Sequence, residues 1–85
     1  MAKEIVIYSK IVCPYCVKAK FLLKRKGVDF NEIIVSDEKT MNEMIEKSGG
    51  MKTVPQIFVD GKHIGDCDHL YKLDSNGELD GILGL

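Results

Sequence analysis

The chain has 85 residues, 45% of them hydrophobic and 29% charged, with a net charge of -1. A chain this short closes one hydrophobic core, so we expect a single domain over residues 1–85, and the composition excludes intrinsic disorder. Apolar runs are only a few residues long, whereas a membrane-spanning helix needs about twenty, and no secretory signal is recognisable, so we expect a cytoplasmic protein.

The predicted elements begin with a strand, a helix and a second strand. Residues 5–8 are apolar on both faces, which is typical of a central strand buried between helices. Pro14 can open a helix as its first residue, and apolar residues recur at helical spacing until Gly27 ends it. A second strand follows over residues 30–35, which implies parallel pairing and a right-handed crossover.

The second half of the chain predicts a helix, a hairpin and a C-terminal helical region. Met41 and Met44 mark the helix, with Ser36 or Asp37 as its cap and two glycines at its end. Asp60-Gly61 is a two-residue signal for a type I′ turn between antiparallel strands. The remaining expected elements are strands at 56–59 and 62–64, a helix at about 67–74 and a last turn or two at 78–83.

The three cysteines are more consistent with a redox-active site than with structural disulfides. Three is an odd number and too few for the disulfide framework of a small secreted protein. The cytosol keeps cysteines reduced unless they are oxidised and reduced in a catalytic cycle. The run Cys13-Pro14-Tyr15-Cys16 lies at the junction of the central strand and the first helix. With Pro14 as first helical residue, Cys13 becomes the N-cap, and its sulfur faces the unpaired amides of the first turn.

This position predicts different roles for the two thiols. A helix N-terminus lowers the pKa of a cysteine from about 8.5 into a range of roughly 3.5 to 7.5, so Cys13 is the expected nucleophile. Lys10 and Lys20 add positive potential, which salt screens. Cys16 lies one turn further in on the apolar face, so we expect a buried resolving thiol that expels the product from a mixed disulfide.

The positive charge is concentrated at the start of the chain. Residues 1–26 carry seven Lys/Arg against one acid (+6), and residues 27–85 carry five against twelve (-7). A basic excess often indicates nucleic acid or anionic membrane. Residues 24–26, however, lie where a helix C-terminus favours cations, and we expect neither partner.

A zinc site is the structural alternative for the cysteine pair. Cys67 with His63 or His69 could complete four ligands. Structural zinc pairs usually lie on knuckle turns with a second close pair, whereas here no cysteine follows Cys16 until Cys67. We therefore expect no metal, and we interpret Cys67 as a buried residue without a redox role.

Three motifs follow one another along the chain: Cys13-Pro14-Tyr15-Cys16, Thr53-Val54-Pro55-Gln56-Ile57-Phe58-Val59 and Gly65-Asp66-Cys67-Asp68-His69-Leu70. Together they resemble the glutaredoxin family, and most closely its short bacterial dithiol class, often called glutaredoxin 3. The likeness covers nearly the whole chain. It implies an α/β thioredoxin fold with a four-stranded mixed sheet in the order 2-1-3-4, flanked by three to four helices, a cis bond before Pro55, and glutathione beside Cys13.

The resemblance also implies which residues bind glutathione. The backbone of Val54 pairs with the cysteinyl part of the tripeptide, a miniature of strand addition to a sheet edge. Thr53 and Pro55 shape the ledge around Val54. Lys10 and Gln56 match positions that hold the glycine carboxylate. Tyr15 flanks the groove.

The γ-glutamyl end of glutathione is expected at the third motif. The helix start at Cys67 and Asp68 matches this part of the site, and free amides at a helix N-terminus bind a carboxylate. The family pattern has a second glycine where this chain has Asp66, and a final acid where it has His69. A cationic His69 cannot face the ligand's ammonium, so Asp66 or Asp68 is expected to replace the acid, with His69 kept as a candidate neighbour.

These features predict a monomeric, glutathione-dependent thiol-disulfide oxidoreductase that reduces protein disulfides and glutathione mixed disulfides. Glutathione is the co-substrate, no cofactor is tightly bound, and the resemblance implies electrons from NADPH through a separate reductase. Two alternatives stay open. One is an electron donor of the same fold reduced by thioredoxin reductase; the other is a scaffold holding an iron-sulfur cluster through Cys13 and glutathione, which Pro14 disfavours.

Overall fold

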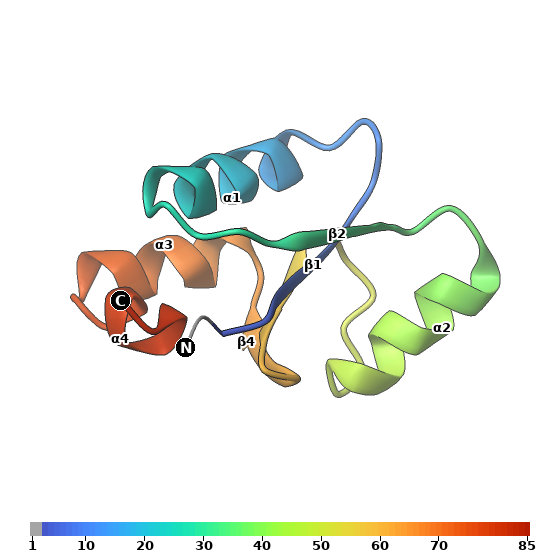
Figure 1. The fold of residues 1–85 in the computed structure, drawn as a ribbon. Coiled ribbons are helices and arrows are strands. Elements are labelled where there is room, and N and C mark those ends of the chain that lie inside the picture. Colours follow the sequence, from blue (N-terminus) through green and yellow to red (C-terminus); the bar gives the residue numbers. More distant parts are fainter. Residues whose placement is uncertain (1–2) are drawn as a thin grey trace.

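The computed structural model describes residues 3–85 as a four-stranded sheet with four helices (Figure 1). The sheet order is β2-β1-β3-β4, which confirms the predicted order 2-1-3-4 and the thioredoxin fold. The elements are β1 (Ile5–Ser9), α1 (Pro14–Arg25), β2 (Asn31–Ile34), α2 (Glu38–Lys47), β3 (Gln56–Val59), β4 (Lys62–Gly65), α3 (Cys67–Ser75) and α4 (Leu79–Leu83).

The sheet is mixed, with one parallel and two antiparallel strand pairs among the described residues. β1 pairs in parallel with β2, to which α1 connects it, and antiparallel with β3 on its other side, so β1 is an inner strand as predicted. β3 and β4 form the antiparallel hairpin. Its turn has Asp60 at φ 51° and Gly61 at φ 81°, the positive angles that a type I′ turn requires.

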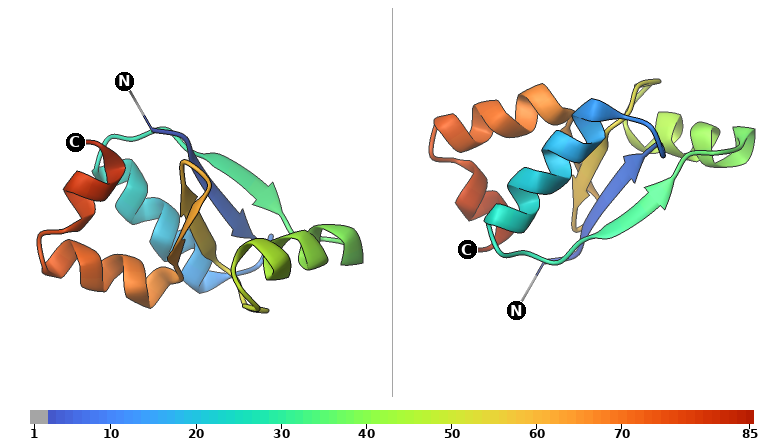
Figure 2. Two further views of the ribbon diagram at one scale, coloured as in Figure 1. Left: turned by 90° about the horizontal axis from the view of Figure 1, so that it is seen from below. Right: turned by 90° about the horizontal axis from the view of Figure 1, so that it is seen from above.

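The helices form two layers on opposite faces of the sheet (Figure 2). α1, α3 and α4 pack on one face, where Leu22, Leu70 and Leu79 are fully buried. α2 packs on the other face, where Met44 contacts the cluster around Tyr8. Burying each such side chain contributes about 1.5 to 3 kcal/mol, so these two clusters hold the layers together. No helix within residues 3–85 combines the length and apolarity needed to cross a bilayer.

Each of the three longer helices begins at a side-chain cap. Cys13 caps α1 as predicted, and Asp37 rather than Ser36 caps α2, with its carboxylate accepting from the Thr40 amide at 2.8 Å. α3 begins after Asp66, whose carboxylate accepts from the amide of His69 at 3.0 Å. A capping role for Asp66 was not part of the sequence prediction, although an aspartate directly before a helix is a recognisable signal.

Candidate active site

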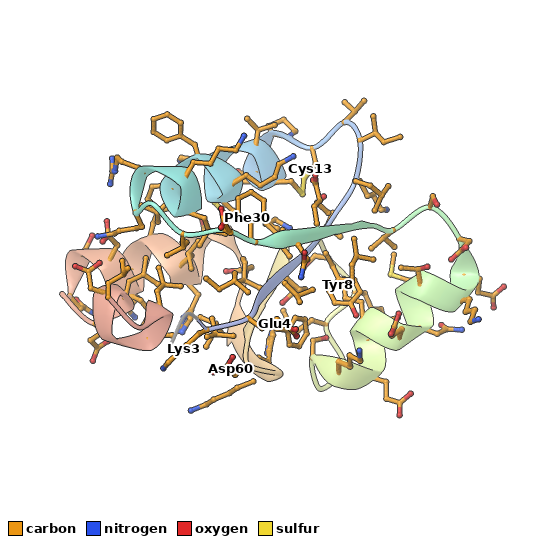
Figure 3. All side chains as sticks on the ribbon, viewed as in Figure 1. Lys3, Glu4, Tyr8, Cys13, Phe30 and Asp60 are labelled. Carbon is orange, nitrogen blue, oxygen red and sulfur yellow. A yellow bond between two sulfur atoms is a disulfide. The ribbon has the colours of Figure 1, made fainter. Side chains whose placement is uncertain are left out.

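Cys13 lies where the loop after β1 enters α1 (Figure 3). Its backbone is extended, at φ -152° and ψ 100°, and its sulfur accepts a hydrogen bond from the Cys16 amide at 3.2 Å. The two cysteines form a disulfide, with their Cα atoms 5.2 Å apart. The predicted N-cap and the predicted dithiol are both confirmed.

The two sulfurs differ in their access to solvent. Cys16 is 1% exposed and belongs to the buried face of α1, whereas Cys13 is half-buried. A substrate disulfide can therefore approach Cys13 but not Cys16. This is the asymmetry expected of a nucleophile followed by a resolving thiol.

A hollow of about 310 Å³ lies between the N-termini of α1 and α3 and the loop before β3. The peptide bond between Val54 and Pro55 in that loop is cis, as the resemblance implied. The hollow therefore brings together six of the residues predicted to bind glutathione and adds Asp66. Its lining residues are Tyr15, Thr53, Val54, Pro55, Asp66, Cys67 and Asp68.

Three of the predicted site residues lie outside this hollow. Lys10 lines a separate hollow of about 320 Å³ beside the start of α2, which includes Asp37. Gln56 and His69 line another of about 300 Å³, which includes Asp66. Lys10 and Gln56 thus line two different hollows, and their shared role at the glycine carboxylate stays a prediction.

Gln56 is fully buried and its amide is engaged on both sides. Its Nε2 donates to the Thr53 carbonyl at 3.0 Å and to Thr53 Oγ1 at 3.3 Å, and its Oε1 lies 2.7 Å from His63 Nε2. Because the amide nitrogen faces a carbonyl, Oε1 must accept, and His63 Nε2 carries the proton. Gln56 in this conformation supports the Thr53 loop from inside the protein and presents no donor to the hollow.

His63 is suited to stay neutral in this network. Burial is the main cause that lowers its pKa, the nearby His69 lowers it further, and Asp66 opposes them. A neutral imidazole with its proton on Nε2 can still donate to Gln56. The support for Thr53 therefore does not require a charged His63.

The start of α3 is built around close contact between Gly65 and His69. Gly65 has φ 140°, and a Cβ placed there would lie 2.8 Å from Cδ2 of the His69 ring. The exposed His69 ring therefore lies against the glycine backbone, outside the residues that line the hollow between α1 and α3. Cys67 is 3% exposed, and burial is the main cause that raises the pKa of its thiol. A protonated, buried thiol is a poor nucleophile.

Lys20 does not contribute to the cysteine site in the way the sequence predicted. Its ammonium binds Glu32 Oε2 at 2.7 Å, and Ser9 Oγ donates to the same oxygen at 2.5 Å. These hydrogen bonds, the one from Lys20 first, lower the pKa of Glu32. The positive charge of Lys20 is thus neutralised between α1 and β2, which leaves the N-terminus of α1 as the main source of potential at Cys13.

Within residues 3–85, no group of three or more His, Cys, Asp or Glu side chains is arranged to hold a metal ion. The alternative of a zinc site needed Cys67 and a histidine beside the cysteine pair. Cys13 and Cys16 lie at the start of a helix, as the position of Pro14 predicted, and a disulfide joins them.

Comparison with known proteins agrees with this geometry. A family model described as Glutaredoxin matches residues 5–64. The chain is 51% identical to glutaredoxin 3 of Escherichia coli strain K12 over 77 residues, which cover 91% of this chain and 93% of the relative. It is similar to the solution structure of a Brucella melitensis glutaredoxin, with 47% identity, TM-score 0.84, and coverage of 96% and 89%. It is also similar to a buckwheat glutaredoxin-glutathione complex, with 30% identity, TM-score 0.86, and coverage of 96% and 77%.

Proposed function

This chain belongs to the glutaredoxin family, and from that membership we propose which of its residues perform each step. It is a glutathione-dependent thiol-disulfide oxidoreductase with a Cys-Pro-Tyr-Cys dithiol. We propose that it acts as a cytoplasmic, monomeric single domain without a tightly bound cofactor. The observation that carries the assignment of roles is the half-buried Cys13 sulfur at the N-terminus of α1, 3.2 Å from the Cys16 amide.

With a glutathione mixed disulfide, reduced Cys13 suffices. Its thiolate attacks the glutathionyl sulfur, a new sulfur-sulfur bond forms, and the substrate leaves as a thiolate that takes a proton from solvent. A second glutathione thiolate then attacks the glutathionyl sulfur held by Cys13. Oxidised glutathione leaves and the Cys13 thiolate is regenerated.

With a protein disulfide, both cysteines take part. Cys13 attacks one sulfur of the substrate and releases the first substrate thiol, and Cys16 then attacks the Cys13 sulfur and releases the second. The enzyme is left with the disulfide between Cys13 and Cys16. Two molecules of glutathione reduce it and leave as oxidised glutathione, so the two electrons given to the substrate are replaced.

We place glutathione in the hollow between α1 and α3. The backbone of Val54 pairs with its cysteinyl part, Thr53 and Pro55 shape the ledge, and Tyr15 closes the side next to Cys13. The start of α3 at Cys67 offers amides to the γ-glutamyl carboxylate, as helix N-termini do.

Charges at the two ends of the tripeptide complete the proposed site. The exposed Asp68 lines the hollow and suits the γ-glutamyl ammonium, with Asp66 beside it. Lys10 is exposed in the loop that leads to Cys13, and its long side chain suits the glycine carboxylate. Gln56 acts in this proposal by holding Thr53, because its own amide is already paired.

The deciding experiment is the rate of alkylation of the reduced protein as a function of pH. One thiol should react with an apparent pKa well below the ordinary value of about 8.5, and that reaction should be absent from Cys13→Ser and retained in Cys16→Ser. A wild-type protein whose thiols all titrate like free cysteine would contradict the proposal.

A second measurement separates the two alternative functions. Glutathione should reduce the oxidised protein, and thioredoxin reductase should not be required. Reduction by thioredoxin reductase alone would establish the same-fold electron donor. Visible absorbance in freshly purified protein would instead establish the cluster-holding scaffold.

A further inference from the structure

The outward face of α1 is apolar although it faces solvent. Val17 and Phe21 are 60% and 61% exposed, and with the exposed Pro14 they recur at helical spacing on one face. Val12, just before Cys13, is 90% exposed. These four residues, Val12, Pro14, Val17 and Phe21, are called the α1 ridge below.

The surroundings of the α1 ridge are positively charged. Between Glu4 and Asp29 the chain contains no acidic residue. Lys18 and Lys24 on α1 make no ion pair with any of the residues that the structure describes, and Lys18 lies over the Tyr71 ring at 5.4 Å. The ridge thus combines exposed apolar side chains with two lysines that form no ion pair among the described residues.

The ridge and the glutathione hollow can be used at the same time. The hollow opens between α1 and α3 and the loop around Val54, whereas the ridge lies on the face of α1 directed away from the buried core. Cys13 lies at the N-terminus of α1, next to residues of both the ridge and the hollow. A glutathionylated protein can therefore place its glutathione in the hollow while the polypeptide beside its cysteine lies along the ridge.

We propose that the α1 ridge is a docking surface for protein substrates that carry an apolar side chain and acidic side chains close to the reacting cysteine. This inference rests on the proposed function of Cys13 and adds a preference among its substrates. Exposed apolar surface with a polar rim marks interaction sites, and complementary charge selects the partner and speeds its association.

The geometry sets the spacing of the substrate's side chains. Phe21 follows Cys13 by eight residues, which corresponds to about 12 Å along a helix axis. An extended polypeptide covers that distance in roughly four residues. The best substrate should have its apolar residue about four positions from the cysteine. One Asp or Glu between them should face Lys18, and a second just beyond the apolar residue should face Lys24, which follows Phe21 by one helical turn.

The test compares synthetic glutathionylated peptides with a small glutathione mixed disulfide. The acidic peptide has Leu about four positions from the cysteine, one acid between the two and a second acid just beyond Leu. Its matched control has lysines in place of the acids. We expect kcat/KM of the wild-type protein to be about tenfold higher for the acidic peptide, mainly through association, and this ratio to fall with added salt. Equal values for the two peptides would overturn the inference.

Variants on the ridge make the assignment specific. Phe21→Ser and Lys24→Glu should each raise KM for the acidic peptide several-fold and leave turnover of the small mixed disulfide unchanged. Leu85→Ser and Lys39→Glu are matched controls, because Leu85 is 61% exposed and Lys39 is exposed, and both lie outside α1. Controls that change KM as much as the ridge variants would contradict the proposal.

The remaining outcomes distinguish other occupants of the ridge. Binding to anionic phospholipid vesicles that depends on Phe21, without any peptide preference, would assign the ridge to a membrane surface and overturn the proposal. Dimerisation abolished by Phe21→Ser would assign it to a second copy, with the same consequence. Failure of the wild-type protein to turn over the small mixed disulfide would instead contradict the proposed function itself.

Discussion

The N-termini of α1 and α3 adjoin the same hollow but carry different caps. At α1 the capping atom is the sulfur of Cys13, 3.2 Å from a backbone amide, and at α3 it is a carboxylate oxygen of Asp66, 3.0 Å from one. Both helix ends stabilise negative charge in the same way. Only the sulfur can then form a bond to a substrate, so one helix start is suited to catalysis and the other to binding.

The charges around the two helix starts differ as well. α1 contains no acidic residue, whereas α3 has Asp66 as its cap and Asp68 in its first turn. A thiolate at Cys13 therefore meets only positive potential from its own helix. The acidic start of α3 suits the ammonium of a γ-glutamyl group, while its remaining amides suit the carboxylate.

The largest expected effect comes from removing the Cys13 sulfur that caps α1. Cys13→Ser keeps a hydrogen-bonding atom at the start of α1 but removes the nucleophile, so turnover of glutathione mixed disulfides should fall by roughly a thousandfold or more. The measurement is glutathione-dependent reduction of a small mixed disulfide. Cys16→Ser is the matched control and should retain this activity, since the resolving thiol is not needed. Comparable activity in the two variants would refute the role of Cys13.

The acidic charge at α3 should affect binding more than chemistry. Asp68→Asn removes the proposed partner of the γ-glutamyl ammonium, and KM for a glutathione mixed disulfide should rise several-fold while kcat changes little. Steady-state kinetics over a range of substrate concentrations separates the two constants. Asp80→Asn, an exposed carboxylate at α4, is the control and should leave both unchanged. A fall in kcat alone would contradict the binding role.

Removing the Asp66 carboxylate that caps α3 should slightly reduce the free energy of unfolding. Asp66→Ala leaves the His69 amide without its partner, and loss of an N-cap costs about 1 kcal/mol of unfolding free energy. Urea denaturation of the oxidised protein measures the change. Asp66→Asn preserves the cap geometry and should lose only a few tenths of a kcal/mol, because Asn is as good a cap as Asp. Equal losses in both variants would show that charge, not the hydrogen bond, is what matters at this helix.

The cap of α2 provides the smallest and most pH-dependent effect. Hydrogen bonds from the Thr40 side chain and amide lower the pKa of Asp37 below its ordinary value. Because the folded-state pKa is the lower one, the stabilisation is present above the unfolded-state pKa of about 4 and is lost as pH falls through the folded-state pKa. The melting temperature of Asp37→Asn should therefore fall less than that of the wild type as the pH is lowered.

The comparison that tests this is made between the wild type and Asp37→Asn across the acidic range. The two melting temperatures should converge as the pH falls. Asp29→Asn serves as the control, since this exposed carboxylate is not a helix cap. A constant difference between wild type and Asp37→Asn at every pH would exclude titration of this cap as the cause.

Most of the fold could be predicted from local signals. Pro14 and Gly27 marked the ends of α1, and Asp60-Gly61 marked the hairpin, because capping and turn geometry depend on neighbouring residues. The parallel pairing of β1 with β2 followed from the helical crossover, whereas the place of β1 beside β3 was implied by the family resemblance. The bounds differed by one residue at several ends, where fraying makes any boundary uncertain.

The site was predicted less completely, because its remaining features depend on contacts between distant segments. Gln56 was expected to bind the ligand, which stays a prediction, and the structure adds that its amide is paired with Thr53 and with His63 from the next strand. Lys20 was expected to act on Cys13, but β2 presents Glu32 to it. Neither partner could be identified from sequence spacing alone.

The sequence by itself determined that a reactive cysteine stands at the start of a helix, since a proline after the cysteine and an apolar helical repeat are local features. Only the tertiary structure decided which side chains surround that cysteine. Packing of α3 and the loop around Val54 against α1 formed the hollow, and the same packing left the outer face of α1 uncovered. Side-chain partners across a sheet or between helices depend on three-dimensional register, which no single segment contains.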